Sequence, residues 1–322
     1  MSLPIHRASE LKDGPPTRWA VKPFVAYGAI TELVGAAKAA GKSTLVQHMI
    51  KAHLDGGSFL GEPCVAGEVL LVTEEDTTTL REALELADLL RPDLHTLQWP
   101  NVWSKPWQEL SRDLRKAIKE IGVKLVIIDT FPQFAPESEA DSESGLEALR
   151  PVRMIAHDGV AVILIRHERK AGGGVGKSGR GTSAIPGGVD IMLHLKRRAA
   201  KASNTRALTA LSRFRATPEE TIIELTDKGY VRVDKGAAEL NASKVKVLAI
   251  LNGEYRSTQE ILDATKMTRS TVQRALVDLL ASGAIVKSGI GSRTSPLVYK
   301  KMPDIELKKK KNKISIDAKS AV

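Results

Sequence analysis

The sequence predicts an α/β fold, with a mainly parallel sheet covered by helices on both faces, and a small winged helix-turn-helix domain after it. Three observations carry this prediction. Short, almost wholly apolar segments such as "EVLLVT", "KLVIID" and "VAVILI" read as buried strands. Segments of helical spacing alternate with them, which is typical of parallel sheets. After residue 242 the pattern changes to three helical segments and two short strands around "GIGSRTS".

The length of 322 residues exceeds what one core usually serves, so we expect one large domain and one smaller one. Breakers and changes of pattern, such as "DGPP" near the start, give the expected boundaries. Three late strands, "VDIMLHLKRR", "RALTALSRFR" and "TIIELTDKGYVRVD", are expected to extend the sheet with an antiparallel edge. The expected parts are an N-terminal extension (1–27), the main domain (28–235), a linker (236–242), the winged helix (243–301) and a basic tail (302–322).

Composition narrows the class of protein. The single cysteine, Cys64, excludes an intrachain disulfide and suits a reducing cytoplasm. The start resembles no signal peptide, and the longest apolar run, "VAVILI", is too short to span a bilayer. We therefore expect a cytoplasmic protein without membrane contact.

The net charge of +10 is uneven along the chain. Residues 241–322 hold 16 Lys and Arg against 7 Asp and Glu, a net of +9. A localised basic region favours a polyanionic partner such as DNA. A solvated lysine tail, with "KKKK" at 308–311, is the alternative for part of this excess.

The stretch "GAAKAAGKST" lies between the apolar segment "AITELV" and the helical segment "TLVQHMI". It approximates the phosphate-binding pattern G-x-x-x-x-G-K-[ST], with Ala36 at the leading glycine position. Backbone N–H groups and the helix N-terminus then face phosphates, Lys42 reaches the β- and γ-phosphates, and Ser43 ligates Mg²⁺. An Ala/Gly turn before a helix is the alternative. The predicted nucleotide-binding residues of this stretch are Gly35, Ala36, Lys38, Ala39, Ala40, Gly41, Lys42, Ser43 and Thr44.

Polar residues follow three of the apolar strands. Asp129, after "LVII", can hold the water shell of Mg²⁺, or it can be a helix cap. The run Glu74, Glu75, Asp76 can supply a base for the attacking water, a favourable helix start, or both. His167 can lie beside the γ-phosphate, although a strand-end histidine often has no such role.

A second GKS lies in "KAGGGVGKSGRGTSA" at 170–184. A phosphate loop needs a helix that opens at its lysine, whereas "GRGTSAIPGGVD" follows with four glycines and a proline, so we expect no helix. We expect a cationic loop with Lys170, Lys177 and Arg180, suited to a single-stranded nucleic acid backbone. A surface loop without a role is the alternative.

The order "GAAKAAGKST", "VTEED", "LVIIDTF", "LIRHERK", "RGTSAI" resembles the RecA/DnaB superfamily of P-loop ATPases. It is most similar to RepA-like hexameric replicative helicases, over about residues 17–215. The resemblance implies ATP and Mg²⁺ as cofactors, Glu75 as catalytic base, His167 as γ-phosphate sensor and Arg180 as an arginine finger. An arginine finger that reaches a neighbouring subunit implies a homo-oligomeric ring, a hexamer in this family. Ala36 and Ala39 depart from the family's pattern.

The C-terminal pattern is similar to winged-helix regulators over 243–300. Ser257 and Glu260 form a capping box, and Thr268 lies near the N-cap of the third helix. The residues expected at DNA are Lys170, Lys177, Arg269, Thr271, Gln273, Arg274, Lys287 and Arg293. Protein docking is the alternative for this domain. The expected function is that of an ATP-driven motor on DNA. The alternative is an ATP-switched replication initiator, recombination mediator or transposition regulator. A small-molecule kinase is the least favoured function.

Overall fold

The structure is a computed structural model that describes residues 5, 7–10, 14–37, 41–169, 174–176, 179, 184–198, 204–227, 229–292 and 295–302. By its internal contacts the chain divides into two compact units. The first comprises residues 1–196, 207–221 and 228–231, and the second comprises residues 197–206, 222–227 and 232–322. Each is described separately below.

A nine-stranded sheet has the order β13-β12-β11-β10-β3-β9-β8-β6-β7. The pairs from β10 to β7 are all parallel, so the predicted mainly parallel sheet is confirmed. Its strands are β3 (Ile30–Gly35), β6 (Val69–Thr73), β7 (Leu94–Gln98), β8 (Leu125–Asp129), β9 (Ala161–His167), β10 (Ile191–Arg197), β11 (Thr205–Ser212), β12 (Glu220–Thr226) and β13 (Gly229–Arg232).

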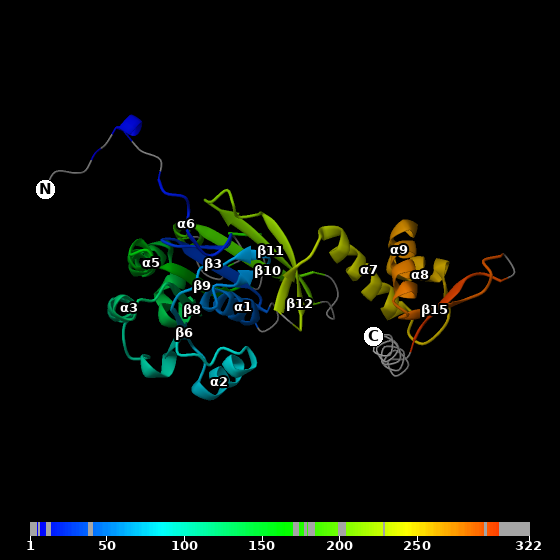
Figure 1. Ribbon diagram of the computed structural model, residues 1–322, viewed down its shortest axis with the longest axis horizontal. Coiled ribbons are helices and arrows are strands. Elements are labelled where there is room, and N and C mark those ends of the chain that lie inside the picture. Colours follow the sequence, from blue (N-terminus) through cyan, green and yellow to red (C-terminus); the bar gives the residue numbers. More distant parts are fainter. Residues whose placement is uncertain are drawn as a thin grey trace, which may run out of the picture. The chain divides into compact units, whose positions relative to one another are not determined.

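Helices cover both faces of the parallel strands. Alternate residues of β6, β8 and β9 pack with two amphipathic helices, α3 (Trp107–Ile121) and α5 (Ser142–His157), in one large core. The helix α1 (Lys42–Leu54) contacts β3 and lies on the other side of the strands from α3 and α5 (Figure 1). The other elements of this region are α2 (Thr77–Leu86), α4 (Phe131–Phe134), α6 (Ala184–Gly188), the 3-10 turns η1 (Ala8–Glu10), η2 (Trp99–Asn101) and η3 (Pro136–Glu139), and the strand pairs β1 (Trp19–Val21) with β2 (Val25–Ala26) and β4 (Ser58–Phe59) with β5 (Glu62–Pro63).

The structure differs from the sequence prediction at several places of this region. The segment "TIIELTDKGYVRVD", expected as one strand, forms the two strands β12 and β13. Residues 19–26, expected in an extension, form the β1–β2 hairpin, and Val21, Phe24 and Val25 are buried. Such short strands are too brief to show a periodicity. The edge strand β7 was not predicted, because its sequence "LHTLQ" is half polar. The stretch expected to lack helix contains α6, which is only five residues long and begins at Ala184, not at the second GKS.

The second unit holds three helices, α7 (Lys235–Ile250), α8 (Thr258–Thr265) and α9 (Arg269–Ala281). They share a core with a three-stranded sheet of order β14-β16-β15, built from β14 (Arg256–Ser257), β15 (Ile285–Ser288) and β16 (Val298–Lys301). The predicted capping box of Ser257 and Glu260 is present, and Thr268 caps α9 at the backbone N–H of Thr271. The strand β14 was not predicted.

The stretch 236–242, expected as a linker, is helical and belongs to the first turns of α7. Its sequence "GAAELNA" is rich in strong helix formers, and Leu240 packs against the core of the second unit. Within the described part of the chain, no helix is long and apolar enough to cross a bilayer.

Candidate functional site

Four neighbouring parallel strands, β3, β9, β8 and β6, end at the same carboxyl edge of the sheet. The register places Gly35 of β3 opposite His167 of β9, and Thr73 of β6 opposite Asp129 of β8. Ligands of open α/β sheets bind at this edge, because the loops after the strands diverge there. The polar residues that follow the strands in sequence therefore meet at one place.

A cavity of about 380 Å³ opens at this edge. It brings together most of the described residues that the sequence singled out: the two ends of the phosphate loop, the acidic end of β6, Asp129 and His167. Thr73, Thr130 and Ala37 also line it and were not predicted. The full lining is Ala36, Ala37, Gly41, Lys42, Ser43, Thr44, Thr73, Glu74, Glu75, Asp129, Thr130 and His167.

The helix α1 opens at the first GKS, as the sequence predicts. Gly41 takes the left-handed conformation, with φ of 85°, that turns the chain into the helix, and glycine adopts it without strain. Among the described residues no side chain caps the first turn, so its N–H groups face the cavity with the positive end of the helix dipole. This is an anion site of the kind that holds phosphate.

The Lys42 ammonium is buried and lies back against its own loop. It donates hydrogen bonds to the carbonyl oxygens of Gly35 at 2.9 Å and Ala36 at 3.1 Å. Burial lowers the pKa of Lys42, while the carboxylates of Asp129 and Glu168 oppose this shift. A buried cation with two carboxylates near it can exchange its carbonyl contacts for phosphate oxygens.

Each of the three consecutive acids has a different environment. Asp76 caps α2 by accepting from the N–H groups of Thr78 and Thr79, at 2.9 and 3.1 Å. Glu74 accepts from the Thr130 hydroxyl at 3.2 Å. The prediction that one of the three acids caps the helix is therefore confirmed, and the cap is Asp76.

Glu75 is the half-buried member of this run. Within the described part of the chain its carboxylate has no hydrogen-bond or ion-pair partner, and burial followed by the charges of Glu74 and Asp76 raises its pKa. A carboxylate that lines the cavity and is not committed to a partner can accept a proton from water. Glu75 thus fits the role of base better than Glu74 does.

Asp129 is the most strongly perturbed acid of the cavity. Burial, and then the charges of Glu74 and Glu75, raise its pKa to about 7, although Lys42 acts in the opposite direction. A divalent cation next to Asp129 favours the ionised carboxylate and would therefore lower this raised pKa.

The oxygen donors of the cavity fit Mg²⁺. Ser43 and Asp129 both line it and supply a hydroxyl and a carboxylate. In the described part of the chain no group of three or more His, Cys, Asp or Glu side chains could hold a metal ion by itself. Proteins commonly bind Mg²⁺ through one or two side chains, together with water and substrate phosphates.

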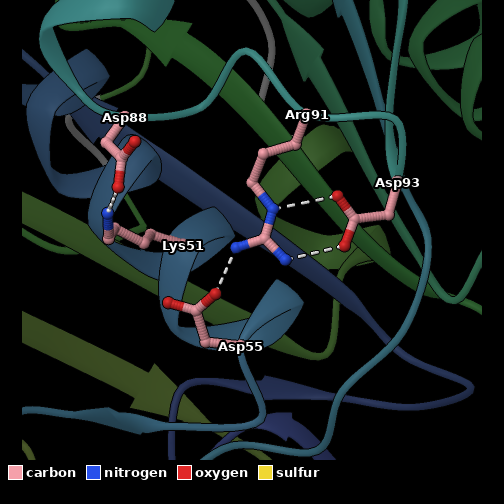
Figure 2. A network of polar contacts seen from close by, with 5 residues as sticks. All are labelled: Lys51, Asp55, Asp88, Arg91 and Asp93. Carbon is pink, nitrogen blue, oxygen red and sulfur yellow. Dashed lines mark hydrogen bonds and ion pairs between the residues drawn. The ribbon is translucent and has the colours of Figure 1, made fainter.

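The far ends of the two helices that begin at the cavity are joined by ion pairs, shown in Figure 2. Lys51 of α1 binds Asp88, just beyond α2, at 2.5 Å. Arg91 binds Asp93 through two nitrogens, at 3.0 and 2.8 Å, and also Asp55 at the end of α1. The two-nitrogen geometry of Arg91 is the more specific contact, whereas single exposed pairs contribute little. The two-nitrogen contact joins Arg91 and Asp93 within one loop, and α1 is linked to the chain after α2 by the single pairs Lys51–Asp88 and Arg91–Asp55, so the network stabilises this arrangement only weakly.

A buried ion pair behind the cavity was missed by the sequence prediction. Glu32 of β3 and Arg166 of β9 are both fully buried, with Nη1 and Oε1 2.6 Å apart. The signal was present, since each is a charged residue inside an otherwise apolar strand. Gly179 pairs with Glu168, and a Cβ at Gly179 would lie 3.0 Å from Nη1 of Arg166. The second glycine-rich stretch is therefore anchored on this pair at Gly179.

Several predicted residues lie outside the described residues, so their roles stay predictions: Lys38, Ala39, Ala40, Lys170, Lys177, Arg180 and Arg293. In the second unit, Arg269, Gln273 and Arg274 of α9 and Lys287 of β15 are exposed. The Thr271 hydroxyl is 2.8 Å from that of Thr268, so it takes part in the helix cap.

The fold and the cavity are those of a P-loop ATPase domain, and comparison with known proteins agrees. A family model described as an AAA domain matches residues 4–173, more than half of the chain, and the chain belongs to this family. A KaiC-like protein from the hyperthermophilic archaeon Pyrococcus horikoshii has a similar structure, with a TM-score of 0.50 and 19% sequence identity. The similarity covers 68% of this chain and 100% of that protein, and it shows the RecA-like fold. No curated protein matches the sequence.

Proposed function

We propose that the protein is an ATP-hydrolysing motor on DNA, and that it works as a ring-forming replicative helicase on single-stranded DNA. The observation that carries the proposal is the cavity at the carboxyl edge. It combines an uncapped helix N-terminus, Lys42, Ser43, Asp129 and an uncommitted carboxylate at Glu75. Nucleotide binding needs the helix N-terminus, Lys42, Ser43 and Asp129, whereas hydrolysis also needs Glu75.

In this proposal each residue has one role. The N–H groups of α1 and the Lys42 ammonium bind the β- and γ-phosphates, and Ser43 and Asp129 hold Mg²⁺. Bound there, Mg²⁺ would supply positive charge beside the phosphates. Glu75 orients a water molecule and accepts its proton, and its raised pKa makes that transfer easier than for an ordinary glutamate.

The ring is proposed from two residues. His167 ends the strand next to β3 and lines the cavity, where it can contact the γ-phosphate. Arg180 follows Gly179, the residue anchored on the buried pair of Glu32 and Arg166. An arginine that completes the site of a neighbouring subunit requires a homo-oligomer, and we propose a hexamer.

We propose DNA binding by the second unit on its architecture and charge. Three helices and a sheet with the β15–β16 hairpin match a winged helix-turn-helix over 243–301, with α9 as recognition helix. Arg269, Gln273 and Arg274 are exposed near the start of α9, and Lys287 is exposed on the hairpin. The net charge of +9 over 241–322 supports a phosphate backbone as partner.

A second candidate is an ATP-switched regulator, such as a replication initiator, recombination mediator or transposition regulator, whose second unit also docks a protein. One observation favours it. Val277 of α9 is 67% exposed and lines a hollow of about 430 Å³ with Leu240 and Gln273. An exposed apolar side chain on the same helix as the proposed DNA contacts suits a protein surface.

The experiment that separates the two candidates has two steps. Phosphate release is measured with and without single-stranded DNA, and strand displacement is then measured on a forked duplex. The motor predicts stimulated hydrolysis and ATP-dependent displacement, both lost in Lys42→Ala. Site-specific duplex binding that needs no ATP, without displacement, would overturn the motor in favour of the regulator.

A further inference from the structure

A second hollow, separate from the nucleotide cavity, lies at the other edge of the same sheet. Its volume is about 590 Å³. It is lined by the second half of α3, by the residues that lead into β8 (Gly122, Val123, Lys124) and by those that lead into β9 (Asp158, Gly159, Val160). It therefore lies where β8 and β9 begin, whereas the nucleotide cavity lies where they end.

The lining is strongly basic. Five cations line the cavity, and Asp158 is the one acid among its lining residues; the cations are Arg112, Arg115, Lys116, Lys119 and Lys124. Both oxygens of Asp158 are already held by Arg115, at 2.6 and 2.8 Å. Arg115, with smaller contributions from His157 and Lys119, keeps the pKa of Asp158 low, so this acid stays charged and committed.

The remaining cations have little to neutralise them. Lys116 lies 3.9 Å from Glu120, and both side chains are well exposed, so the pair is weak. Arg112, Lys119 and Lys124 form no ion pair with any of the described residues. A concave surface with four such cations concentrates positive potential, which attracts an anion with several charges.

The lining offers several cations for phosphates and no aromatic ring on which a base can stack. The other lining residues are glycines and the aliphatic Ile118, Val123 and Val160, so none can stack on a base or read its edge. Arg112, Lys116 and Lys119 follow one another at spacings of four and three residues on one face of α3. At about 1.5 Å per residue this row extends over roughly 10 Å, enough for consecutive phosphates of one strand.

We propose that this basic cavity binds the phosphodiester backbone of single-stranded nucleic acid, independently of base sequence. It is a contact separate from α9 and from the stretch around 168–188. It does not require that the protein unwinds DNA or that the second unit binds DNA.

The test compares two double variants with the same change of charge. Arg112→Gln/Lys119→Gln removes two cavity cations, and Arg81→Gln/Arg150→Gln removes two exposed arginines of α2 and α5 that do not line it. Glutamine is a good helix former, so the helices persist in both variants. The binding of a fluorescein-labelled oligo-dT is measured by anisotropy, without nucleotide, over a range of KCl concentrations.

The cavity variant should bind several-fold more weakly at low salt. Its log–log salt slope should be smaller by about 1.4, the contribution of two phosphate contacts to a single strand. The control variant should keep the wild-type slope, and both should keep wild-type ATPase activity without DNA. Equal losses in both variants would mean that only net charge matters, and a wild-type slope in the cavity variant would mean that the cavity takes no part; either result overturns the proposal.

A second arm separates nucleic acid from a small anion. The melting temperatures of the wild type and of both double variants are measured with and without inorganic tripolyphosphate. If tripolyphosphate stabilises the wild type but not the cavity variant, while oligo-dT binding is equal in both, the cavity is a small-anion site and the proposal fails. Loss of oligo-dT binding in the cavity variant supports it, whether or not strand displacement is ever observed.

Discussion

Asp129→Asn should stabilise the protein at neutral pH when neither nucleotide nor Mg²⁺ is present. The Asp129 carboxyl is buried next to Glu74 and Glu75, and its pKa rises from the ordinary 3.8 to about 7. A raised carboxyl pKa means that the folded state binds the proton more tightly than the unfolded state. Its stabilising contribution is therefore complete below pH 3.8 and is lost as the pH rises through about 7.

The size of the effect follows from the shift. About 3 pKa units correspond to ~4 kcal/mol of differential stability above pH 7. About 2–3 kcal/mol of this is lost between pH 5 and pH 8, and asparagine, which does not titrate, avoids that loss. The figure is an upper limit, because the variant also removes a carboxylate near the buried Lys42 ammonium.

The assay is thermal unfolding of both proteins at pH 5 and pH 8. A change of 1 kcal/mol shifts the melting temperature of a domain of this size by about 2–4 °C. The melting temperature of the variant minus that of the wild type should therefore be roughly 5–10 °C larger at pH 8 than at pH 5. Addition of Mg²⁺ and ADP should reverse the order at pH 8, since the cation binds the carboxylate. A difference between the proteins that is the same at both pH values would refute a raised pKa at Asp129.

Three further variants test other parts of the account. Lys42→Ala should abolish ATP hydrolysis, because the ammonium that reaches the phosphates is lost; a phosphate-release assay that shows wild-type turnover contradicts this. Arg180→Ala should abolish hydrolysis and leave binding of a fluorescent ATP analogue largely intact, and normal turnover would rule out a finger in a neighbouring site. Gly179→Ala should lower stability by about 1–3 kcal/mol in urea unfolding, because its Cβ meets the buried pair of Arg166 and Glu32 at 3.0–3.4 Å. Gly174→Ala, with nothing within 4 Å of its Cβ, is the control and should unfold as the wild type does.

The parts of the fold that could be predicted from sequence are those with a local cause. The almost wholly apolar segments of β8 and β9 predict strands of a sheet covered on both faces, and Gly41 before a helical stretch marks the phosphate loop. The carboxyl ends of parallel strands meet, so Asp129, Glu75 and His167 could be placed together without a structure.

What could not be predicted depends on tertiary contacts. Glu32 and Arg166 lie 134 positions apart in the sequence. No local sequence pattern indicates that these two buried charges form an ion pair. The family resemblance already implies Glu75 as the base, but the contact that sets Glu74 apart, the hydrogen bond from Thr130, depends on the tertiary structure. The basic cavity needs Asp158 and Lys124 beside α3, and the sequence shows α3 only as an amphipathic helix with a charged face.

The most direct test of the central claim is the rate of phosphate release from ATP, with and without single-stranded DNA, in the wild type, Glu75→Gln and Glu74→Gln. Single-stranded DNA should raise the rate of the wild type. Glu75→Gln should lower turnover by about 10²–10⁴-fold with nucleotide binding retained, and Glu74→Gln should keep most of the activity. Unchanged turnover in Glu75→Gln, or a wild-type rate that single-stranded DNA does not alter, would contradict the account.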